Sequence, residues 1–314
     1  MTTTFPSKPG SFPLPGYPVL VGPFTHLVEE RDRLSALRWN HFEARRLGAT
    51  IGAEISGPDL TAELSDEVID ELRQALHDYK VIFFRDQPMS PSQHVALARR
   101  FGELEIHPFL LSNTGEPELV RFEKTAELTG YENSWHHDVT WRECPSMGAV
   151  LHALSVPEHG GDTLFSDMYA AYDSLDDKTK LDIDELVAVH NFIQTFGAGM
   201  SREQRQKAQL QYPPVRHPVV CTHPFTGKRH LYVNRPFVSH IDGMDRDESS
   251  HLIDRLCRQA DAPEHQCRFT WTADAVAFWD NRAVQHYASS DYWPHVRTME
   301  RASIVGERPL RLRV

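Results

Sequence analysis

The sequence predicts a mixed α/β, mainly β fold, a double-stranded β-helix or jelly roll with flanking helices. Three observations support this expectation. Two helical segments flank a short apolar run before residue 103, many short β-type runs follow residue 115, and turn signals such as "EHGGD" and "PFTGK" separate those runs. The chain has 314 residues and is therefore long enough to bury a substantial core.

The composition is that of a globular protein, with 40% hydrophobic and 25% charged residues. A net charge of −11 argues against nucleic acid as the main partner, because a duplex binder needs a basic surface. No run approaches the roughly 18 apolar residues of a membrane span. The four scattered cysteines and the absence of a signal-peptide pattern predict reduced thiols in a cytoplasmic protein. Such a protein can assemble as a homodimer or homotetramer.

The N-terminal 46 residues are expected to form a proline-rich arm outside the core. Six prolines lie between positions 6 and 23, and proline favours an extended chain. Residues 47–314 are then expected to form one jelly-roll domain. Within it, "LSDEVIDELRQALHDYK" predicts a first helix capped by Ser65, because its apolar residues recur at helical spacing. "VIFFR" (81–85) follows as a buried strand.

The next segment, "SPSQHVALARRFG" (90–102), predicts a second helix that starts with a capping box between Ser90 and Gln93. A helical insert near 168–210 and another helix near 247–260 interrupt the later β-type runs. Those eight runs read "ELVRFE", "SWHHDVTW", "GAVLHAL", "DTLFS", "HPVVCTH", "HLYVN", "DAVAFWD" and "RTMERASIV".

One of these runs, "SWHHDVTW", holds a candidate metal-binding pair. Side chains two residues apart on a strand share a face, so His136 and Asp138 point together while His137 points away. A third ligand from a distant strand would complete the two-histidine, one-carboxylate set of non-haem Fe(II) oxygenases. The short motif alone is weak, and a structural hydrogen-bonded pair is the alternative. A second such pair, His240 and Asp242, precedes a turn and lacks an apolar strand around it, so we treat it as a decoy.

Two arginines near the end of the chain indicate an anion-binding face. If "RTMER" is a strand, Arg297 and Arg301 lie on one face with Met299 between them. Burying arginine is costly without an anionic partner, and its planar guanidinium suits carboxylates and sulfonates. A solvated charged face is the alternative, but "ASIVG" continues directly as core-like strand.

With these residues in place, the chain resembles the TauD/TfdA family of Fe(II)- and 2-oxoglutarate-dependent dioxygenases, and within it the taurine and alkylsulfate dioxygenases. The resemblance covers roughly residues 47–310. It rests on "WHHDVTW", "VPEHGGDTLFSD", "HPVVCTHPFTGKRHLYVN" and "FWDNRAVQHYASSDYWPH" in the family's order and approximate spacing. It implies a cupin-like jelly roll that uses Fe(II), with 2-oxoglutarate and O2 as co-substrates.

The resemblance also assigns the metal and co-substrate residues. It implies that His136, Asp138 and His286 bind the iron, and that no catalytic residue is needed beyond these ligands. The distal carboxylate of 2-oxoglutarate would meet Arg297 and the Thr163 hydroxyl in "GGDT".

The substrate residues follow by the same resemblance. Arg301 would face the sulfur oxyanion of a small organic anion, assisted by His107 in "EIHP". Val139 and Phe196 match positions that line the same pocket. Hydroxylation of the carbon beside a sulfonate or sulfate ester would release an aldehyde and sulfite or sulfate, while 2-oxoglutarate becomes succinate and CO2.

Two departures from the taurine enzyme's pattern affect the substrate. Glu132 replaces an asparagine, and Leu110 replaces a pocket tyrosine. An apolar alkyl or aryl tail suits Leu110, whereas Glu132 would attract an ammonium group, so both substrate types stay open. Three alternatives remain: a phenoxyalkanoate dioxygenase in which Arg301 holds a carboxylate, a jelly-roll metalloenzyme independent of 2-oxoglutarate, and a non-catalytic anion-binding protein.

Overall fold

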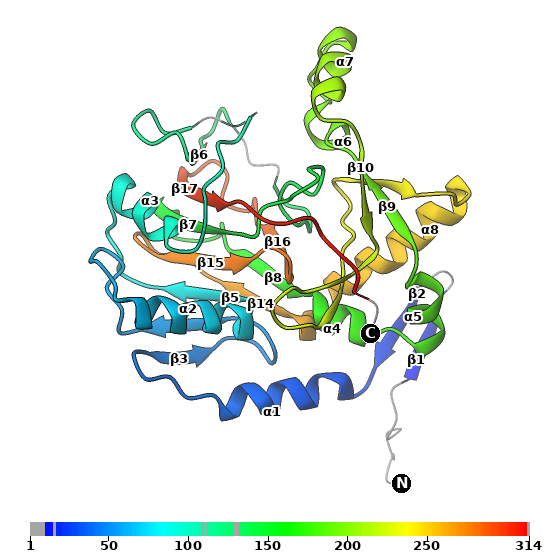
Figure 1. Cartoon of the computed structure of the whole chain (residues 1–314), viewed down its shortest axis with the longest axis horizontal. Coiled ribbons are helices and arrows are strands. Elements are labelled where there is room, and N and C mark those ends of the chain that lie inside the picture. Colours follow the sequence, from blue (N-terminus) through cyan, green and yellow to red (C-terminus); the bar gives the residue numbers. More distant parts are fainter. Residues whose placement is uncertain (1–9, 15–16, 109, 111, 129–131, 313–314) are drawn as a thin grey trace.

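The structure, a computed structural model, describes residues 10–14, 17–108, 110, 112–128 and 132–312 (Figure 1). Its largest element is a seven-stranded sheet in which all neighbours are antiparallel except β4 and β5. In spatial order its strands are β3 (Glu43–Arg46), β4 (Ala53–Ser56), β5 (Val81–Phe84), β15 (Val276–Asp280), β7 (Gly148–Ser155), β17 (Arg297–Ile304) and β6 (Leu119–Lys124). A three-stranded sheet of β14 (Gln266–Phe269), β8 (Thr163–Asp167) and β16 (Val284–Ala288) accompanies it.

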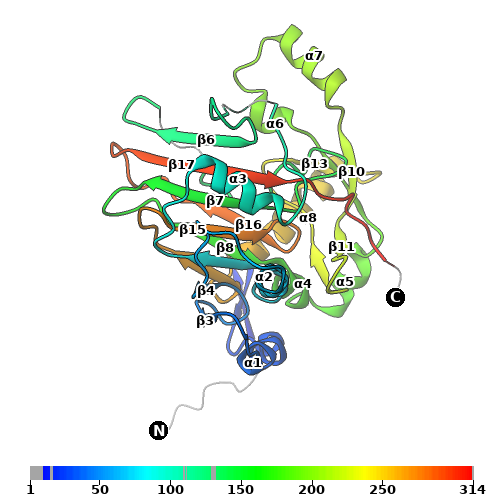
Figure 2. The same cartoon turned by 60° about the vertical axis from the view of Figure 1, so that its left-hand side comes forward.

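The two sheets enclose an aromatic core. Phe83 of β5 stacks on Phe269 of β14 with ring centroids 4.1 Å apart, and Phe165 of β8 packs against Trp279 of β15 at 5.8 Å. Large rings of this kind bury much apolar surface and supply most of the packing energy between layers. Two facing sheets with helices outside them confirm the predicted fold class (Figure 2).

Both predicted helices cover the outer face of the large sheet. In α2 (Asp66–Tyr79), the Ser65 hydroxyl accepts a hydrogen bond from the Val68 N–H and caps the helix. In α3 (Pro91–Arg99), Ser90 and Gln93 form the predicted capping box. The apolar side of α2 packs on β5 and β15 in a second core cluster. These helices formed as predicted because caps and periodicity are local signals.

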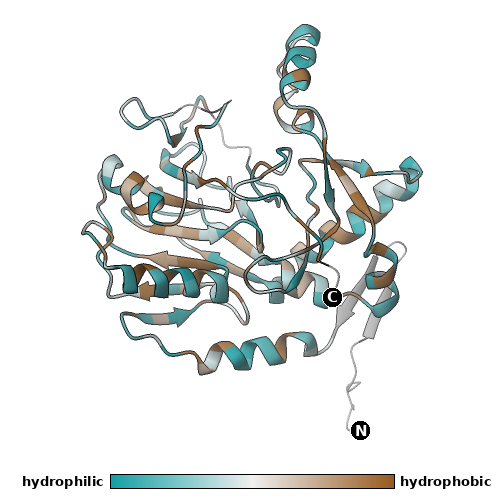
Figure 3. Cartoon of the chain, in the orientation of Figure 1, coloured by the Kyte–Doolittle hydropathy of each residue, from teal (hydrophilic) through white to brown (hydrophobic). Residues whose placement is uncertain are grey.

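The predicted helical insert near 168–210 differs from the structure, because a strand interrupts it. The helices are α4 (Met168–Asp173), α5 (Asp177–Ile183), α6 (Ile193–Phe196) and α7 (Arg202–Gln211). Between α5 and α6 lies β9 (Val187–His190), which pairs with β10 (Val215–Pro218) and β13 (Val238–Ile241). The run "VAVH" is short, β-branched and almost fully buried, which favours a strand over a helix. Figure 3 shows α7 as a mostly hydrophilic helix that projects from the body.

Five further elements lie between residues 220 and 265. They are the hairpin β11 (Val220–Thr222) and β12 (Arg229–Leu231), helix α8 (Arg246–Cys257), and the short 3-10 helices η2 (Arg258–Asp261) and η3 (Pro263–His265). No helix within the described ranges is long and apolar enough to cross a membrane.

Two expectations about histidine-containing strands are wrong. "SWHHDVTW" is not a continuous strand: His136 makes a single bridge to His286, and the chain then turns at Asp138. The Asn281 side chain stabilises this turn, because its amide oxygen accepts from the Asp138 N–H and its amide nitrogen donates to the Asp138 carbonyl. His240, in contrast, does lie in a strand, β13. Asp242, just beyond this strand, forms an ion pair with Arg216.

The expected arm of residues 1–46 is wrong in its second part. The 3-10 helix η1 (Thr25–Leu27) and helix α1 (Val28–Ala36) follow the proline-rich stretch, and β3 belongs to the large sheet. Leu34 and Phe42 are buried in the core. Within residues 1–46 the last proline is Pro23, so no proline interrupts regular structure in the rest of that segment. Earlier in the arm, β1 (Gly10–Leu14) and β2 (Tyr17–Val21) form a hairpin.

A buried ion-pair network ties α1 to the sheets. Lys80, only 1% exposed, donates to the Thr50 carbonyl at 2.6 Å and to Glu30 at 3.0 Å. Glu30 also binds Arg33 and Lys228. Burial, the largest single influence, raises the pKa of Glu30, but the three cations together hold it well below its ordinary value of 4.5.

We predict that Glu30→Gln lowers the free energy of unfolding at pH 7 by about 1–3 kcal/mol, because Lys80 loses one of its two charged partners and keeps only Asp167 at 3.3 Å. A depressed folded pKa stabilises the protein fully above the unfolded value, so this contribution decreases progressively as the pH falls from about 4.5 toward the lower folded pKa. Urea unfolding measures the free energy of unfolding of wild type and Glu30→Gln at pH 7 and at pH 4. The difference between the two proteins should be smaller at pH 4. Glu29→Gln, an exposed neighbour, should change stability by less than about 0.5 kcal/mol. Equal losses in both variants would contradict the network.

Candidate metal centre

Three predicted ligands converge at one edge of the space between the sheets. The available ligand atoms of His136, Asp138 and His286 all lie within 4.8 Å of one another. The His136 Nε2 and an Asp138 carboxylate oxygen are 3.8 Å apart, and the two imidazole centroids are 4.2 Å apart. Donor atoms at this spacing can share one cation. Two imidazoles and a carboxylate also form the donor set expected for a non-haem iron centre.

Backbone hydrogen bonds fix the two histidines. The His136 N–H donates to the His286 carbonyl at 3.1 Å, and the His286 N–H returns the bond at 2.9 Å. His136 Nδ1 lies 2.7 Å from the Ser134 carbonyl, which assigns the hydrogen to Nδ1 and leaves the Nε2 lone pair facing the centre. Burial and then His136 lower the pKa of His286 to about 3, so its ring is neutral and available as a ligand.

Asp138 is held by a side-chain clamp. The Asn281 amide accepts from the Asp138 N–H at 2.7 Å and donates to its carbonyl at 3.1 Å. The next residue, Val139, has a φ of +46°, a conformation that costs on the order of 1–3 kcal/mol in a β-branched residue. Arg301 donates to both carboxylate oxygens at 3.0 and 2.9 Å. Burial, the largest single influence, raises the pKa of Asp138, but Arg301 together with the neighbouring histidines outweighs it, and the pKa falls to about 2.

His137 lies on the other side of this segment, as predicted. It is fully buried and packs against Tyr232 with ring centroids 4.7 Å apart. Neither ring nitrogen has a hydrogen-bond partner among the described residues. His137 therefore contributes packing rather than a ligand to the centre.

Arg297 and Arg301 lie on one face of β17, as the strand periodicity predicted. Arg297 is 7% exposed and sits between the Trp271 and Tyr292 rings, with its guanidinium carbon 5.9 Å from each centroid. Its Nε and Nη2 atoms find no acceptor within the described part of the chain. Burial lowers its pKa. A buried guanidinium with unused donors is expected to receive an anion.

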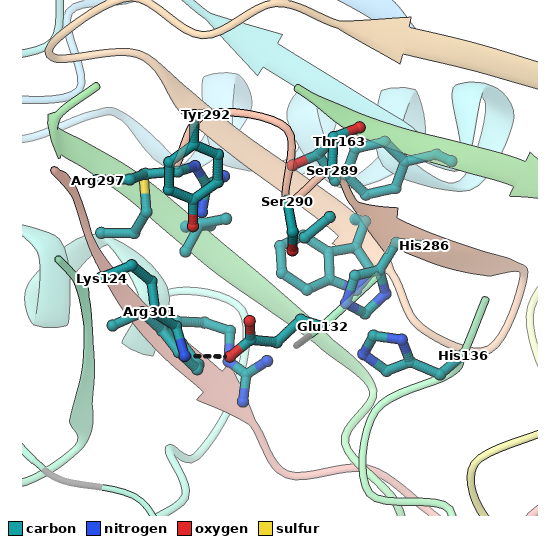
Figure 4. A pocket seen from close by; sticks show the side chains of 16 residues that line it. Lys124, Glu132, His136, Thr163, His286, Ser289, Ser290, Tyr292, Arg297 and Arg301 are labelled. Carbon is teal, nitrogen blue, oxygen red and sulfur yellow. Dashed lines mark ion pairs between the residues drawn. The ribbon is translucent and has the colours of Figure 1, made fainter. Parts of the chain in front are cut away.

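Thr163 lies in the same cavity as Arg297. Its hydroxyl accepts a hydrogen bond from the Trp271 indole N–H at 2.9 Å. We call this cavity pocket A; Figure 4 shows its labelled side chains, which include Lys124, Glu132, His136, Thr163, His286, Ser289, Ser290, Tyr292, Arg297 and Arg301.

A second cavity, pocket B, adjoins the first. The two share Phe122, Glu132, His136 and Arg301. Pocket B also contains the other predicted substrate residues, His107, Val139 and Phe196, together with Leu110, Ser134, Asp138, Thr195, Pro236 and Phe237. The structure thus brings every predicted site residue to one of two connected cavities.

His107 is oriented by its own loop. Its Nδ1 accepts from the Leu110 N–H at 3.1 Å, so the neutral ring carries its hydrogen on Nε2. Burial, followed by the charge of Arg301, lowers the pKa of His107 to about 3. Glu132, whose role the sequence left open, pairs with Lys124 at 2.7 Å.

Residues 43–303 match the family described as taurine catabolism dioxygenase TauD, TfdA family. The chain belongs to this family. It is 33% identical to an alkylsulfatase from Acinetobacter baylyi, over 84% of this chain and 85% of the relative. It is also 33% identical to an alpha-ketoglutarate-dependent sulfate ester dioxygenase from Pseudomonas putida, over 83% and 88%. The crystal structure of a taurine dioxygenase from Burkholderia xenovorans has a TM-score of 0.74, 34% identity, and coverage of 86% and 93%.

These similarities confirm the predicted TauD/TfdA family and its enzyme class, a 2-oxoglutarate (alpha-ketoglutarate)-dependent dioxygenase. The sequence analysis did not predict four further residues at the site of this chain, namely Lys124, Trp271, Asn281 and Tyr292. Asn281 and Tyr292 lie in the stretch that carries His286, so the crowding of polar residues there was an available signal. Trp271 reaches Arg297 and Thr163 through long-range packing, and no local pattern indicates that contact.

We predict that His136→Ala weakens binding of Mn(II) or Fe(II) to this TauD/TfdA protein by more than the roughly 10–100-fold caused by losing an outer-shell partner. His137→Leu, which fills the space of the ring, should stay within about tenfold of wild type even though it alters the core. Anaerobic calorimetric titration measures both affinities, with circular dichroism as a check of folding. Equal losses in the two variants would contradict the face assignment.

Proposed function

We propose that this chain is an Fe(II)- and 2-oxoglutarate-dependent dioxygenase that hydroxylates a small organic anion with an apolar tail. The best candidates are alkyl sulfates and organosulfonates, from which the product would release sulfate or sulfite and an aldehyde. The observation that carries this proposal is the three-ligand centre in the same cavity as Arg297, whose buried Nε and Nη2 atoms have no acceptor among the described residues. Family membership supports the same conclusion.

The residues present fit a ferrous ion. His136, Asp138 and His286 offer two imidazole nitrogens and one carboxylate oxygen, a donor set that suits Fe(II) and would leave coordination positions for other ligands. When bound, iron and 2-oxoglutarate supply the oxidising chemistry that turns O2 and 2-oxoglutarate into succinate, CO2 and a hydroxylated substrate. The protein's part is to fix the ligands and exclude water.

Arg297 and Thr163 would hold the distal carboxylate of 2-oxoglutarate. The Trp271 N–H occupies a lone pair of the Thr163 hydroxyl, so the hydroxyl hydrogen remains available for an anion. The rings of Trp271 and Tyr292 flank the guanidinium and limit its rotation. A planar, restricted donor can form a bidentate pair with a carboxylate at little cost in entropy.

Arg301 and His107 would hold the anionic head of the substrate in pocket B. One terminal nitrogen of Arg301 is used by Asp138, but Nε has no partner in the described ranges. The His107 Nε2–H is a second donor. Leu110, Phe196 and Phe237 give the rest of pocket B an apolar wall, which favours an alkyl or aryl tail. Two fixed donors at the head would determine which carbon lies next to the metal.

Succinate release in air, with Fe(II) and 2-oxoglutarate present, tests the proposal. Medium-chain alkyl sulfates and alkanesulfonates should stimulate release above the substrate-free rate, and taurine should do so weakly. Stimulation by aryloxyalkanoates alone would favour the second candidate, a carboxylate substrate, since a guanidinium holds a carboxylate as well as a sulfonate. The absence of stimulation by all three classes would count against the substrate class.

We predict that Arg297→Ala raises the KM for 2-oxoglutarate about 10–100-fold, the loss expected from one or two charge-assisted hydrogen bonds. The matched control is Arg216→Ala, which removes an exposed arginine from β10. Steady-state assays with a saturating second substrate measure both values. An unchanged KM in Arg297→Ala would show that the arginine does not bind the co-substrate.

The cytoplasmic location and the dimeric or tetrameric state expected from the sequence remain predictions. A small organic anion, rather than nucleic acid or a membrane, remains the expected partner.

A further inference from the structure

Glu132 lines both pockets and forms an ion pair with Lys124 of pocket A, and the proposed chemistry does not use this pair. Lys124, the last residue of β6, is 8% exposed, and its Nζ lies 2.7 Å from Glu132. Lys124 lies opposite Arg297 in the register of β6 and β17. Figure 4 shows Glu132 approaching from the side of His136, so that its carboxylate lies beside Lys124 and Arg301.

The charges around the two pockets determine what the site can accept. Among the described residues that line them, the cations are Lys124, Arg297 and Arg301, and the anions are Glu132 and Asp138. These side chains carry a net charge of +1, which a ferrous ion would raise to +3. Bound 2-oxoglutarate has a charge of −2, so one further negative charge gives a neutral site. Uncompensated charge is costly in a partly buried cavity.

We propose that Glu132, paired with Lys124, is a specificity-determining residue. It limits the organic substrate that binds beside 2-oxoglutarate to a single negative charge. This inference rests on the proposed function. Glu132 lines both pockets, so it lies where the tail of a substrate held by Arg301 would pass. A second anionic group on that tail would meet the Glu132 carboxylate and be repelled. Lys124 occupies one carboxylate oxygen of Glu132 and so keeps Glu132 from acting as a receptor for an ammonium group.

Three ligands of similar length and different charge test this role: butane-1-sulfonate (−1), 3-sulfopropanoate (−2) and the zwitterion 3-aminopropane-1-sulfonate. The protein is loaded with Mn(II) and 2-oxoglutarate, and calorimetry gives the three dissociation constants without turnover. Wild type should bind butane-1-sulfonate most tightly and 3-sulfopropanoate about 10–100-fold more weakly, the size expected of a like-charge contact.

Glu132→Gln should lower the ratio of the 3-sulfopropanoate dissociation constant to that of butane-1-sulfonate by at least about tenfold. It should also tighten 2-oxoglutarate binding, because it removes the repelling charge while the amide can still accept from Lys124. Lys124→Met should do the opposite: it should weaken 2-oxoglutarate binding and shift the preference toward 3-aminopropane-1-sulfonate. The control is Glu123→Gln, which removes an exposed carboxylate from the opposite face of β6 and should leave every ratio at the wild-type value.

The outcomes separate this inference from the proposed function. If 2-oxoglutarate binds in the presence of the metal but Glu132→Gln keeps the wild-type ratio, the charge role is overturned and the dioxygenase assignment stands. If wild type binds no 2-oxoglutarate even with the metal, the proposed function fails and this inference fails with it. A smaller ratio in Glu132→Gln alone, with Glu123→Gln unchanged, supports the role.

Discussion

The mutual backbone hydrogen bonds between His136 and His286 are the constraint on which the site depends. They join segments 150 positions apart in the chain and fix the separation of the two imidazoles before any ion binds. His286 lies on β16, which pairs with β8 in the three-stranded sheet, so the sheet holds the His286 end of this contact in place. Ligands placed on rigid elements can hold a metal geometry that a mobile loop cannot.

The same architecture places the anion-binding groups. β17 pairs with both β6 and β7 in the large sheet, so its alternating side chains point into the space between the sheets at fixed intervals. Arg297 therefore faces pocket A, while Arg301, which follows Met299 on the same face, reaches Asp138 and both pockets. Buried cations and the positive φ of Val139 are costly for folding, and bound ligands would offset part of that cost.

Local signals explain what could be predicted from the sequence. Helix caps at Ser65 and Ser90, and the alternation of β17, depend on neighbours within a few residues, and the structure has all three. His136 and Asp138 share a direction as predicted, but a side-chain clamp from Asn281 causes this, and not a strand. Contacts of that kind join distant segments. For the same reason no local pattern revealed the rings that flank Arg297, or the burial of Leu34 and Phe42 in the core.

The most direct test of the central claim is an anaerobic absorbance titration of the purified protein with Fe(II) and 2-oxoglutarate. If His136, Asp138 and His286 bind one ferrous ion with an open side, chelation of 2-oxoglutarate should produce a visible metal-to-ligand charge-transfer band. The band should saturate at one iron per chain. A folded protein that binds iron without developing this band, or that saturates at a different ratio, would contradict the assignment.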